Sequence, residues 1–242
     1  FHSRYQTYIP EVSSITTGEV RMAANQADFL RRVKSEVGID FKILTGEEEA
    51  HYDYLGVMAT LKIQNAVILD TGGASVELIA VNNGLSTAEV SLPFGAVSLS
   101  EKYNLANEIN QVDINLANRD ICEQYAPLSW LNHQIGDPVI LLGGANRSLA
   151  RMARTYSGEA EVNHIHGYEM SVTMVENIFD DIRHMTRQER EHVAGLEVSR
   201  ADIIISGLLP LLNLMHMISA PKVIFSESGV REGLISETLK ND

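Results

Sequence analysis

The chain has 242 residues, of which 45% are apolar, enough to fill a hydrophobic core and to exclude an intrinsically disordered chain. The formal net charge of −13, from 32 acidic and 19 basic residues, argues against broad binding of nucleic acid or of an anionic membrane surface. A polyanionic substrate remains compatible with this charge, because backbone N–H groups, a metal ion and a few arginines can build an anion site locally.

Cys122 is the single cysteine, so no intrachain disulfide can form, and we expect a reducing cytoplasm as the location. We expect Cys122 itself to be a small packing residue in a helix. No apolar run reaches the length of a membrane span, and the first residues carry neither an initiator Met nor a signal-peptide pattern. Residues 1–8 are typical of the end of a helix stopped by Pro10, so we expect the chain to be part of a longer protein.

The first 65 residues predict four elements in the order strand, helix, strand, helix, at 13–17, 25–37, 41–44 and 45–61. Gly38 is expected to end the first helix as its C-cap. The second helix begins at Thr45, which precedes Glu47, Glu48 and Glu49. Acidic residues favour the positive end of the helix dipole, and capping alone would explain most of this acidic run.

From residue 66 onward, the pattern predicts an antiparallel three-stranded meander followed by strand–helix units. The expected strands are 66–71, 75–81, 86–92, 138–142 and 222–225. The expected helices are 96–103, 107–125, 148–154, 171–183, 187–192 and 200–218, with a terminal helix after 226–233. This order is typical of a ribonuclease-H-like domain of the actin, hexokinase and Hsp70 (ASKHA) superfamily. We therefore predict a two-domain α/β protein, with an incomplete first domain over 1–65 and a second domain over 66–242.

The stretch Asp70-Thr71-Gly72-Gly73-Ala74-Ser75-Val76-Glu77 joins two of these strands by a tight turn. Because glycine has no Cβ, such a turn can direct several backbone N–H groups into one concavity that suits a phosphate. Asp70 and Glu77 flank the turn with no obvious local cation, an arrangement that suits a hydrated Mg²⁺ or a positioned water. An ordinary hairpin is the alternative interpretation of so short a pattern.

A second junction of strand, glycines and helix occurs at Gly143 and Gly144. Backbone N–H groups and a helix N-terminus point the same way at such a junction, so both glycines are candidates for phosphate binding. A simple turn between a strand and a helix remains the alternative.

Several further stretches occur in a fixed order along the chain: Val20-Arg21 with Ala24-Asn25 and Phe29, then 45–50 with 54–57, 70–78, 92–97, 199–207 and 226–233. Residues 70–78 are similar to D-I-G-G-G-S-T-E-L, and residues 45–50 to S-G-x-E-E-A. Jointly, these stretches resemble the Ppx/GppA family of exopolyphosphatases and guanosine pentaphosphate phosphohydrolases. The resemblance extends over essentially the whole chain.

The resemblance implies Mg²⁺-dependent hydrolysis of a terminal phosphoanhydride bond in polyphosphate or guanosine pentaphosphate. By position, Glu49 matches the family's catalytic glutamate, which activates or orients the attacking water. Asp70 and Glu77 match acidic residues that hold the metal and the water. Arg21 matches a basic residue that faces the phosphates. Gly72, Gly73 and Ser75 match the phosphate-binding loop, in which Ala74 stands where the family usually has glycine.

Two other features depart from the family. Val76 replaces a threonine, and the N-terminal D-x-G-S-N-S hairpin is not within this sequence. We therefore expect little or no catalysis from these residues alone. Dimerisation is common in the family, which makes a homodimer a candidate assembly. Two alternative functions stay open: a phosphate- or nucleotide-binding module without turnover, and an ATP-dependent kinase of the same superfamily.

Overall fold

The computed structural model describes residues 14–241, and the chain divides into two compact units that meet between Thr45 and Gly46. The sequence placed a domain boundary at 65/66 instead. The difference arises because the helix over 46–60 belongs to the larger unit, where its apolar residues pack on the sheet. The assignment of two ribonuclease-H-like domains, 1–65 and 66–242, stays a prediction.

The smaller unit contains a pair of short parallel strands and two helices. Its elements are β1 (Ile15–Thr16), α2 (Gly18–Met22), α3 (Gln26–Val37) and β2 (Lys42–Ile43). Gly38 ends α3 in the left-handed conformation with φ of 76°, as the sequence predicts. The short helix α2 was not predicted. The predicted helix end before Pro10 lies outside the described residues.

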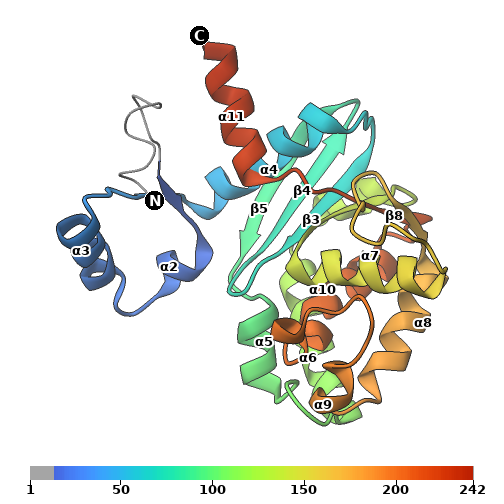
Figure 1. Ribbon diagram of the computed structural model, residues 1–242. Coiled ribbons are helices and arrows are strands. Elements are labelled where there is room, and N and C mark those ends of the chain that lie inside the picture. Colours follow the sequence, from blue (N-terminus) through green and yellow to red (C-terminus); the bar gives the residue numbers. More distant parts are fainter. Residues whose placement is uncertain (1–13, 242) are drawn as a thin grey trace. The chain divides into compact units, whose positions relative to one another are not determined.

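The larger unit is built on a six-stranded mixed sheet with the strand order β5-β4-β3-β6-β8-β7 (Figure 1). Its strands are β3 (Ala66–Thr71), β4 (Val76–Asn82), β5 (Leu85–Leu92), β6 (Val139–Gly143), β7 (Glu169–Ser171) and β8 (Lys222–Phe225). Strands β3, β4 and β5 form the predicted antiparallel meander, and β6 and β8 continue the sheet in parallel with β3. Strand β7, which the sequence did not predict, pairs antiparallel with β8 at the edge.

The helices of the larger unit follow the predicted order with shifted ends. They are α4 (Gly46–Thr60), α5 (Ala96–Tyr103), α6 (Gln111–Tyr125), α7 (Gly144–Tyr156), α8 (Val172–Arg183), α9 (Arg187–Arg190), α10 (Ile204–Met217) and α11 (Val230–Asn241). Two 3₁₀ turns, Ser129–Gln134 and Val198–Arg200, were not predicted. Helix α7 begins at Gly144 rather than at Ser148, so the glycine pair starts the helix directly and leaves no loop before it.

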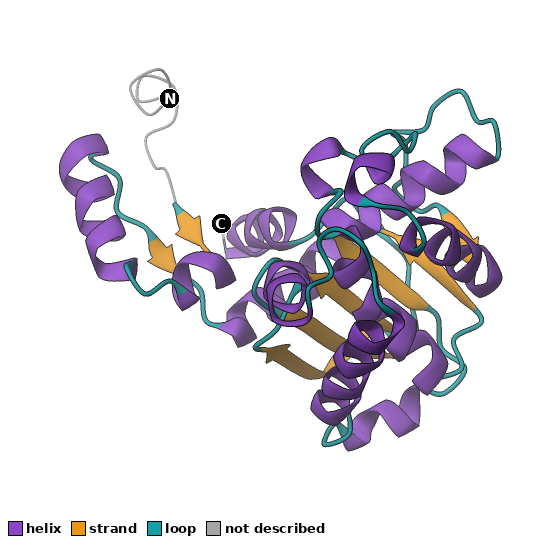
Figure 2. Cartoon of the chain, turned by 90° about the horizontal axis from the view of Figure 1, so that it is seen from below, coloured by secondary structure: helices purple, strands orange, loops and turns teal. Residues whose placement is uncertain are grey.

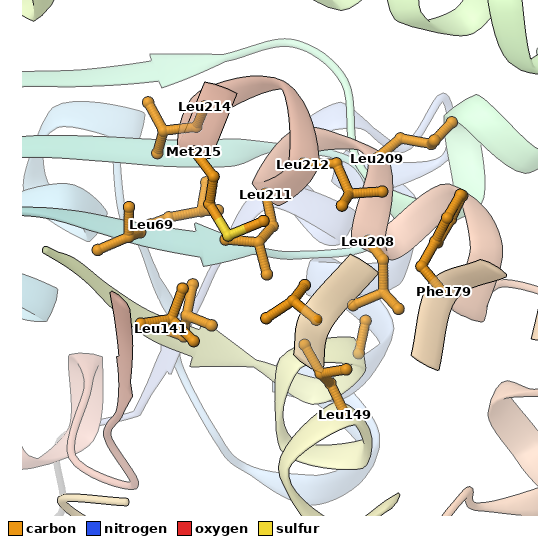
Figure 3. Close-up of a cluster of buried hydrophobic side chains, with 14 of the residues drawn as sticks. Leu69, Leu141, Leu149, Phe179, Leu208, Leu209, Leu211, Leu212, Leu214 and Met215 are labelled. Carbon is orange, nitrogen blue, oxygen red and sulfur yellow. The ribbon is translucent and has the colours of Figure 1, made fainter. Parts of the chain in front are cut away.

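Successive side chains of each strand point to opposite sides of the sheet, and both sides are apolar and covered by helices (Figure 2). On one face, Ile68 and Ile79 pack with Ala50 and Val57 of α4. On the other face, Leu69 joins a larger cluster built with α5, α6, α7, α8 and α10. Figure 3 shows part of that cluster, with Leu69 and Leu141 from the strands and Leu211 and Met215 from α10. The same alternation places Asp70 and Glu77 on the α4 face.

Helices α4 and α11 pack so closely that side chains are excluded from the contact. A Cβ on Gly56 would overlap the backbone carbonyl of Gly229, and a Cβ on Gly233 would overlap the carbonyl of Tyr52. Glycine at Gly56 and Gly233 therefore lets the two backbones meet. This contact fixes α4 against the start of α11 and, with it, the side chains that α4 presents to the sheet.

Cys122 lies in α6 as expected, but it is exposed, with its thiol on Asn213, so the prediction that it is a packing residue is wrong. The buried positions of α6 are Ile114, Ala117, Ile121 and Tyr125, and Cys122 lies about 100° around the helix from Ile121, at the border of the buried face. Within residues 14–241, the structure contains no helix both long and apolar enough to span a membrane.

Candidate active site

The glycine turn between β3 and β4 is held by the start of helix α5. Gly72 closes the turn by donating its N–H to the Ser75 carbonyl at 3.0 Å. The N–H groups of Ala96 and Val97 donate to the carbonyls of Gly72 and Gly73, each at 2.9 Å. The carbonyl oxygens of the turn therefore face α5.

The amides of the turn are left available for an anion. In a trans peptide the N–H is antiparallel to the carbonyl, so the Gly73 and Ala74 amides point away from α5. Within residues 14–241, the Gly73, Ala74 and Ser75 amides donate no hydrogen bond. Ala74 is not among the described residues with positive φ, so an alanine fits here without backbone strain. Three amides of this turn are thus without an acceptor, and their binding of phosphate stays a prediction.

Four carboxylates approach one another beside this turn. Asp70 and Glu77 lie opposite each other across β3 and β4. Helix α4 contributes Glu49, which is 8% exposed, and, one helical turn later, Asp53, which is 0% exposed. A carboxylate oxygen from each of Asp53, Asp70 and Glu77 lies within 4.8 Å of the other two. The structure therefore brings together the three predicted acids and one further acid.

The environment strongly favours the neutral form of Glu77. Burial, followed by the charges of Glu49 and Asp70, raises the pKa of Glu77 from its ordinary 4.5 to about 8. Hydrogen bonds from Ser91 and Ser75 oppose that rise, and the Ser91 hydroxyl donates to Glu77 Oε1 at 2.7 Å. Such a shift reflects acidic groups placed together out of water, a property typical of functional sites.

Asp53 is the residue that the sequence reasoning missed. Burial, followed by the charges of Asp70, Glu77 and Glu49, raises its pKa well above the ordinary value, whereas the Val230 backbone amide lowers it. The Val230 amide does not reach good hydrogen-bond geometry, and neither side-chain oxygen of Asp53 has another partner. The sequence does contain one indication of Asp53: it follows Glu49 by four residues, a spacing that places both carboxylates on one face of a helix.

The second glycine junction has a packing role in this fold. Gly143 has φ of 90°, and a Cβ there would come within 2.6 Å of Asp70 Oδ1. A Cβ on Gly144 would overlap the guanidinium of Arg200, whose Nε donates to Glu197 at 2.9 Å. Packing explains both glycines, and their role in phosphate binding stays a prediction.

Arg21 belongs to the smaller unit, where its guanidinium Nη1 donates to the Leu44 carbonyl at 2.8 Å. The role of Arg21 toward the phosphates therefore also stays a prediction.

The carboxylate cluster suits a hard divalent cation. Its donor atoms are all carboxylate oxygens, the ligand type that Mg²⁺, Mn²⁺ and Ca²⁺ prefer. The two unpartnered oxygens of Asp53 supply acceptors that a cation would satisfy. On this structural ground, the residues present fit a divalent cation.

Residues 4–242 match the Ppx/GppA phosphatase family. The chain belongs to this family. A solved Ppx/GppA structure from Aquifex aeolicus is 25% identical with a TM-score of 0.83, and the match covers 100% of this chain and 78% of that one. An exopolyphosphatase structure from Cytophaga hutchinsonii is 22% identical with a TM-score of 0.89, covering 98% of this chain and 77% of that one.

Membership of the Ppx/GppA family confirms the resemblance found in the sequence and the ASKHA fold class. It also makes the protein a phosphatase-type hydrolase.

Proposed function

We propose that this Ppx/GppA protein hydrolyses terminal phosphoanhydride bonds, releasing phosphate from inorganic polyphosphate, from guanosine pentaphosphate or from both, with Mg²⁺ as cofactor. The observation that carries the proposal is the placement of unpaired loop amides at Gly73, Ala74 and Ser75 beside the carboxylate cluster, two of whose three acids are buried. The amides supply an anion site, and the carboxylates supply acceptors for a cation and for a water proton.

Phosphoryl transfer requires a positioned water and charge neutralisation, with little covalent work by the protein. We assign Glu49 to orient the attacking water and accept its proton, since this side chain is nearly buried beside the acidic cluster. The Gly73, Ala74 and Ser75 amides bind oxygens of the terminal phosphate. Arg21 is assigned to the phosphates on the family resemblance alone.

Asp70 and Glu77 would hold the cation, because they sit opposite each other at the mouth of the glycine turn. When bound, Mg²⁺ neutralises the charge shared by the phosphate oxygens. The Ser91 hydroxyl donates to Glu77 Oε1 and so helps to orient this carboxylate as a ligand. The single cysteine leads us to expect a cytoplasmic protein, and the resemblance leads us to expect a capacity to dimerise.

The function is tested by phosphate release from long-chain polyphosphate and from guanosine pentaphosphate, each with Mg²⁺ and with excess chelator. We expect phosphate release in the presence of Mg²⁺ and loss of that release with the chelator. A binding module without turnover would bind these substrates and release nothing. A kinase would consume ATP only with a phosphate acceptor and would leave polyphosphate intact.

A further inference from the structure

Asp53 is the most deeply buried acid of the cluster. The side chain is 0% exposed, and neither oxygen has a partner with good hydrogen-bond geometry, although the Val230 backbone amide lies close enough to favour the charged form. An ionised carboxylate buried in this way is strongly unfavourable unless a positive charge or hydrogen bonds compensate it. The chain itself does not supply that compensation in full.

Protonation is one way in which such a cluster meets that cost, because a protonated carboxyl group can share its proton with a neighbouring carboxylate. A proton shared in this way joins two acids at a time. Three acids converge here, so a bound group that contacts all of them satisfies Asp53 more completely.

The geometry specifies what kind of group would do so. Oxygens of Asp53, Asp70 and Glu77 converge within 4.8 Å from three different elements, namely α4, β3 and β4. Cations with oxygen ligands at about 2.0–2.6 Å keep those ligands within about 5 Å of each other. A local acidic run on the surface would not converge in this way.

The surroundings keep Asp53 available as a ligand. The adjoining backbone is Gly229, and a Cβ there would lie only 2.9 Å from Asp53 Oδ1. The amide of Val230, at the start of α11, favours the charged form of the carboxylate. Helix α4 is in turn fixed against α11 by the contact at Gly56. The fold thus holds the Asp53 carboxylate toward the cluster.

We propose that Asp53 is a third carboxylate ligand, with Asp70 and Glu77, of a divalent cation of the Mg²⁺ or Mn²⁺ type. This inference rests on the proposed function, which assigns the cation to Asp70 and Glu77. It adds a ligand from α4, the helix that also carries Glu49. A bound cation would therefore link helix α4, which carries Glu49, to the β3–β4 hairpin, which carries the glycine turn.

The test is calorimetric titration of the purified protein with Mn²⁺ as the probe, without substrate. Wild type is compared with Asp53→Asn, which keeps the shape and removes the charge, and with Glu47→Gln, an exposed acid of the same helix. We expect Asp53→Asn to weaken Mn²⁺ binding by at least about 10-fold, and Glu47→Gln to leave it unchanged. Wild-type affinity in Asp53→Asn would overturn the inference, as would a wild-type protein that binds no Mn²⁺.

A crystal structure of the wild type with Mn²⁺ provides a second reading that needs no variant. An anomalous peak within ligand distance of an Asp53 oxygen supports the inference, and a peak held by Asp70 and Glu77 without Asp53 overturns it. The phosphate-release assay reports on the proposed function separately. Phosphate release together with unchanged Mn²⁺ binding in Asp53→Asn would overturn this inference alone. Mn²⁺ binding that depends on Asp53, without phosphate release, would support the inference and contradict the proposed function.

Discussion

Asp70 and Glu77 lie opposite each other across strands β3 and β4, and both face helix α4. Their proximity follows from the register of the hairpin, because residues opposite each other in an antiparallel pair share a face. Two acids in such a position repel each other unless one is protonated or a cation lies between them. The stability of the protein should therefore depend on pH and on divalent cations.

The pH dependence has a definite sign. The pKa of Glu77 is about 8 in the folded protein against an ordinary 4.5, so between these values the folded state binds more protons than the unfolded state. Without divalent cations, the free energy of unfolding should fall as pH rises from about 4.5 to about 8, by on the order of a few kcal/mol from this group. Glu77→Gln has no carboxyl group to titrate at this position, so its free energy of unfolding should depend less steeply on pH.

The measurement is denaturant unfolding of wild type, Glu77→Gln and the exposed control Glu47→Gln at several pH values between 5 and about 9, with a chelator present. Glu77→Gln should be more stable than wild type near pH 8 and have the shallower pH dependence. An identical slope in wild type and Glu77→Gln would show that Glu77 ionises normally in the folded protein.

Gly95 should be essential for the geometry of the phosphate loop. An added Cβ there would come within 2.6 Å of the Gly72 and Gly73 carbonyl oxygens, which accept hydrogen bonds from α5. Gly95→Ala should displace the loop amides and lower phosphate release by at least about 10-fold. Gly158→Ala is the control, since its Cβ would meet open space although φ is 71°. Equal activity of the two variants would contradict this role.

Gly56 should be required for the packing of α4 on α11. Alanine in a helix interior normally stabilises by up to about 1 kcal/mol relative to glycine. At Gly56, the added Cβ would overlap the Gly229 carbonyl, so Gly56→Ala should instead destabilise the protein by about 1–3 kcal/mol. The melting temperature of Gly56→Ala, measured by thermal unfolding, shows whether the substitution stabilises or destabilises the protein. A higher melting temperature in Gly56→Ala would mean that the helices separate freely.

Arg190 organises the loops before α10 through backbone carbonyls. The side chain is fully buried and donates to the carbonyls of Ala201, Met185, Ala106 and Asn107 at 2.7–3.0 Å. Arg190→Met should lower the free energy of unfolding by about 3 kcal/mol, because it leaves buried carbonyls unpaired. Both variants are compared with wild type by denaturant unfolding. Arg187→Met, which removes only a surface ion pair with Glu191, should lower the free energy of unfolding by about 1 kcal/mol or less.

The local parts of this fold were predictable from sequence. The β-branched run before Asp70 and the glycines after it specified the hairpin, and Gly38 specified a helix end. Strand β7 was missed because three residues carry little signal, and its pairing depends on β8, about 50 residues away. The start of α7 was misplaced because glycine is a poor helix former, whereas here close packing at Gly143 and Gly144 selects it.

Only those residues of the candidate site that stand in a sequence motif were predictable. Glu49, Asp70 and Glu77 stood in recognisable stretches, and the structure brings them together. Asp53 stands among the aromatic and aliphatic residues of α4, where an acid is expected to face solvent. Its burial results from the packing of α4 on the sheet and on α11, which no local pattern encodes.

The central claim is that Glu49 activates water for hydrolysis of a phosphoanhydride bond. It is tested by phosphate release from polyphosphate in Mg²⁺, with substrate binding measured in parallel, for wild type, Glu49→Gln and Glu47→Gln. Glu49 is nearly buried and Glu47 is exposed on the same helical turn, which makes the two variants a matched pair. We predict that Glu49→Gln lowers turnover by about 10²–10⁴-fold with little change in binding, while Glu47→Gln behaves as wild type. Wild-type turnover in Glu49→Gln would contradict the account.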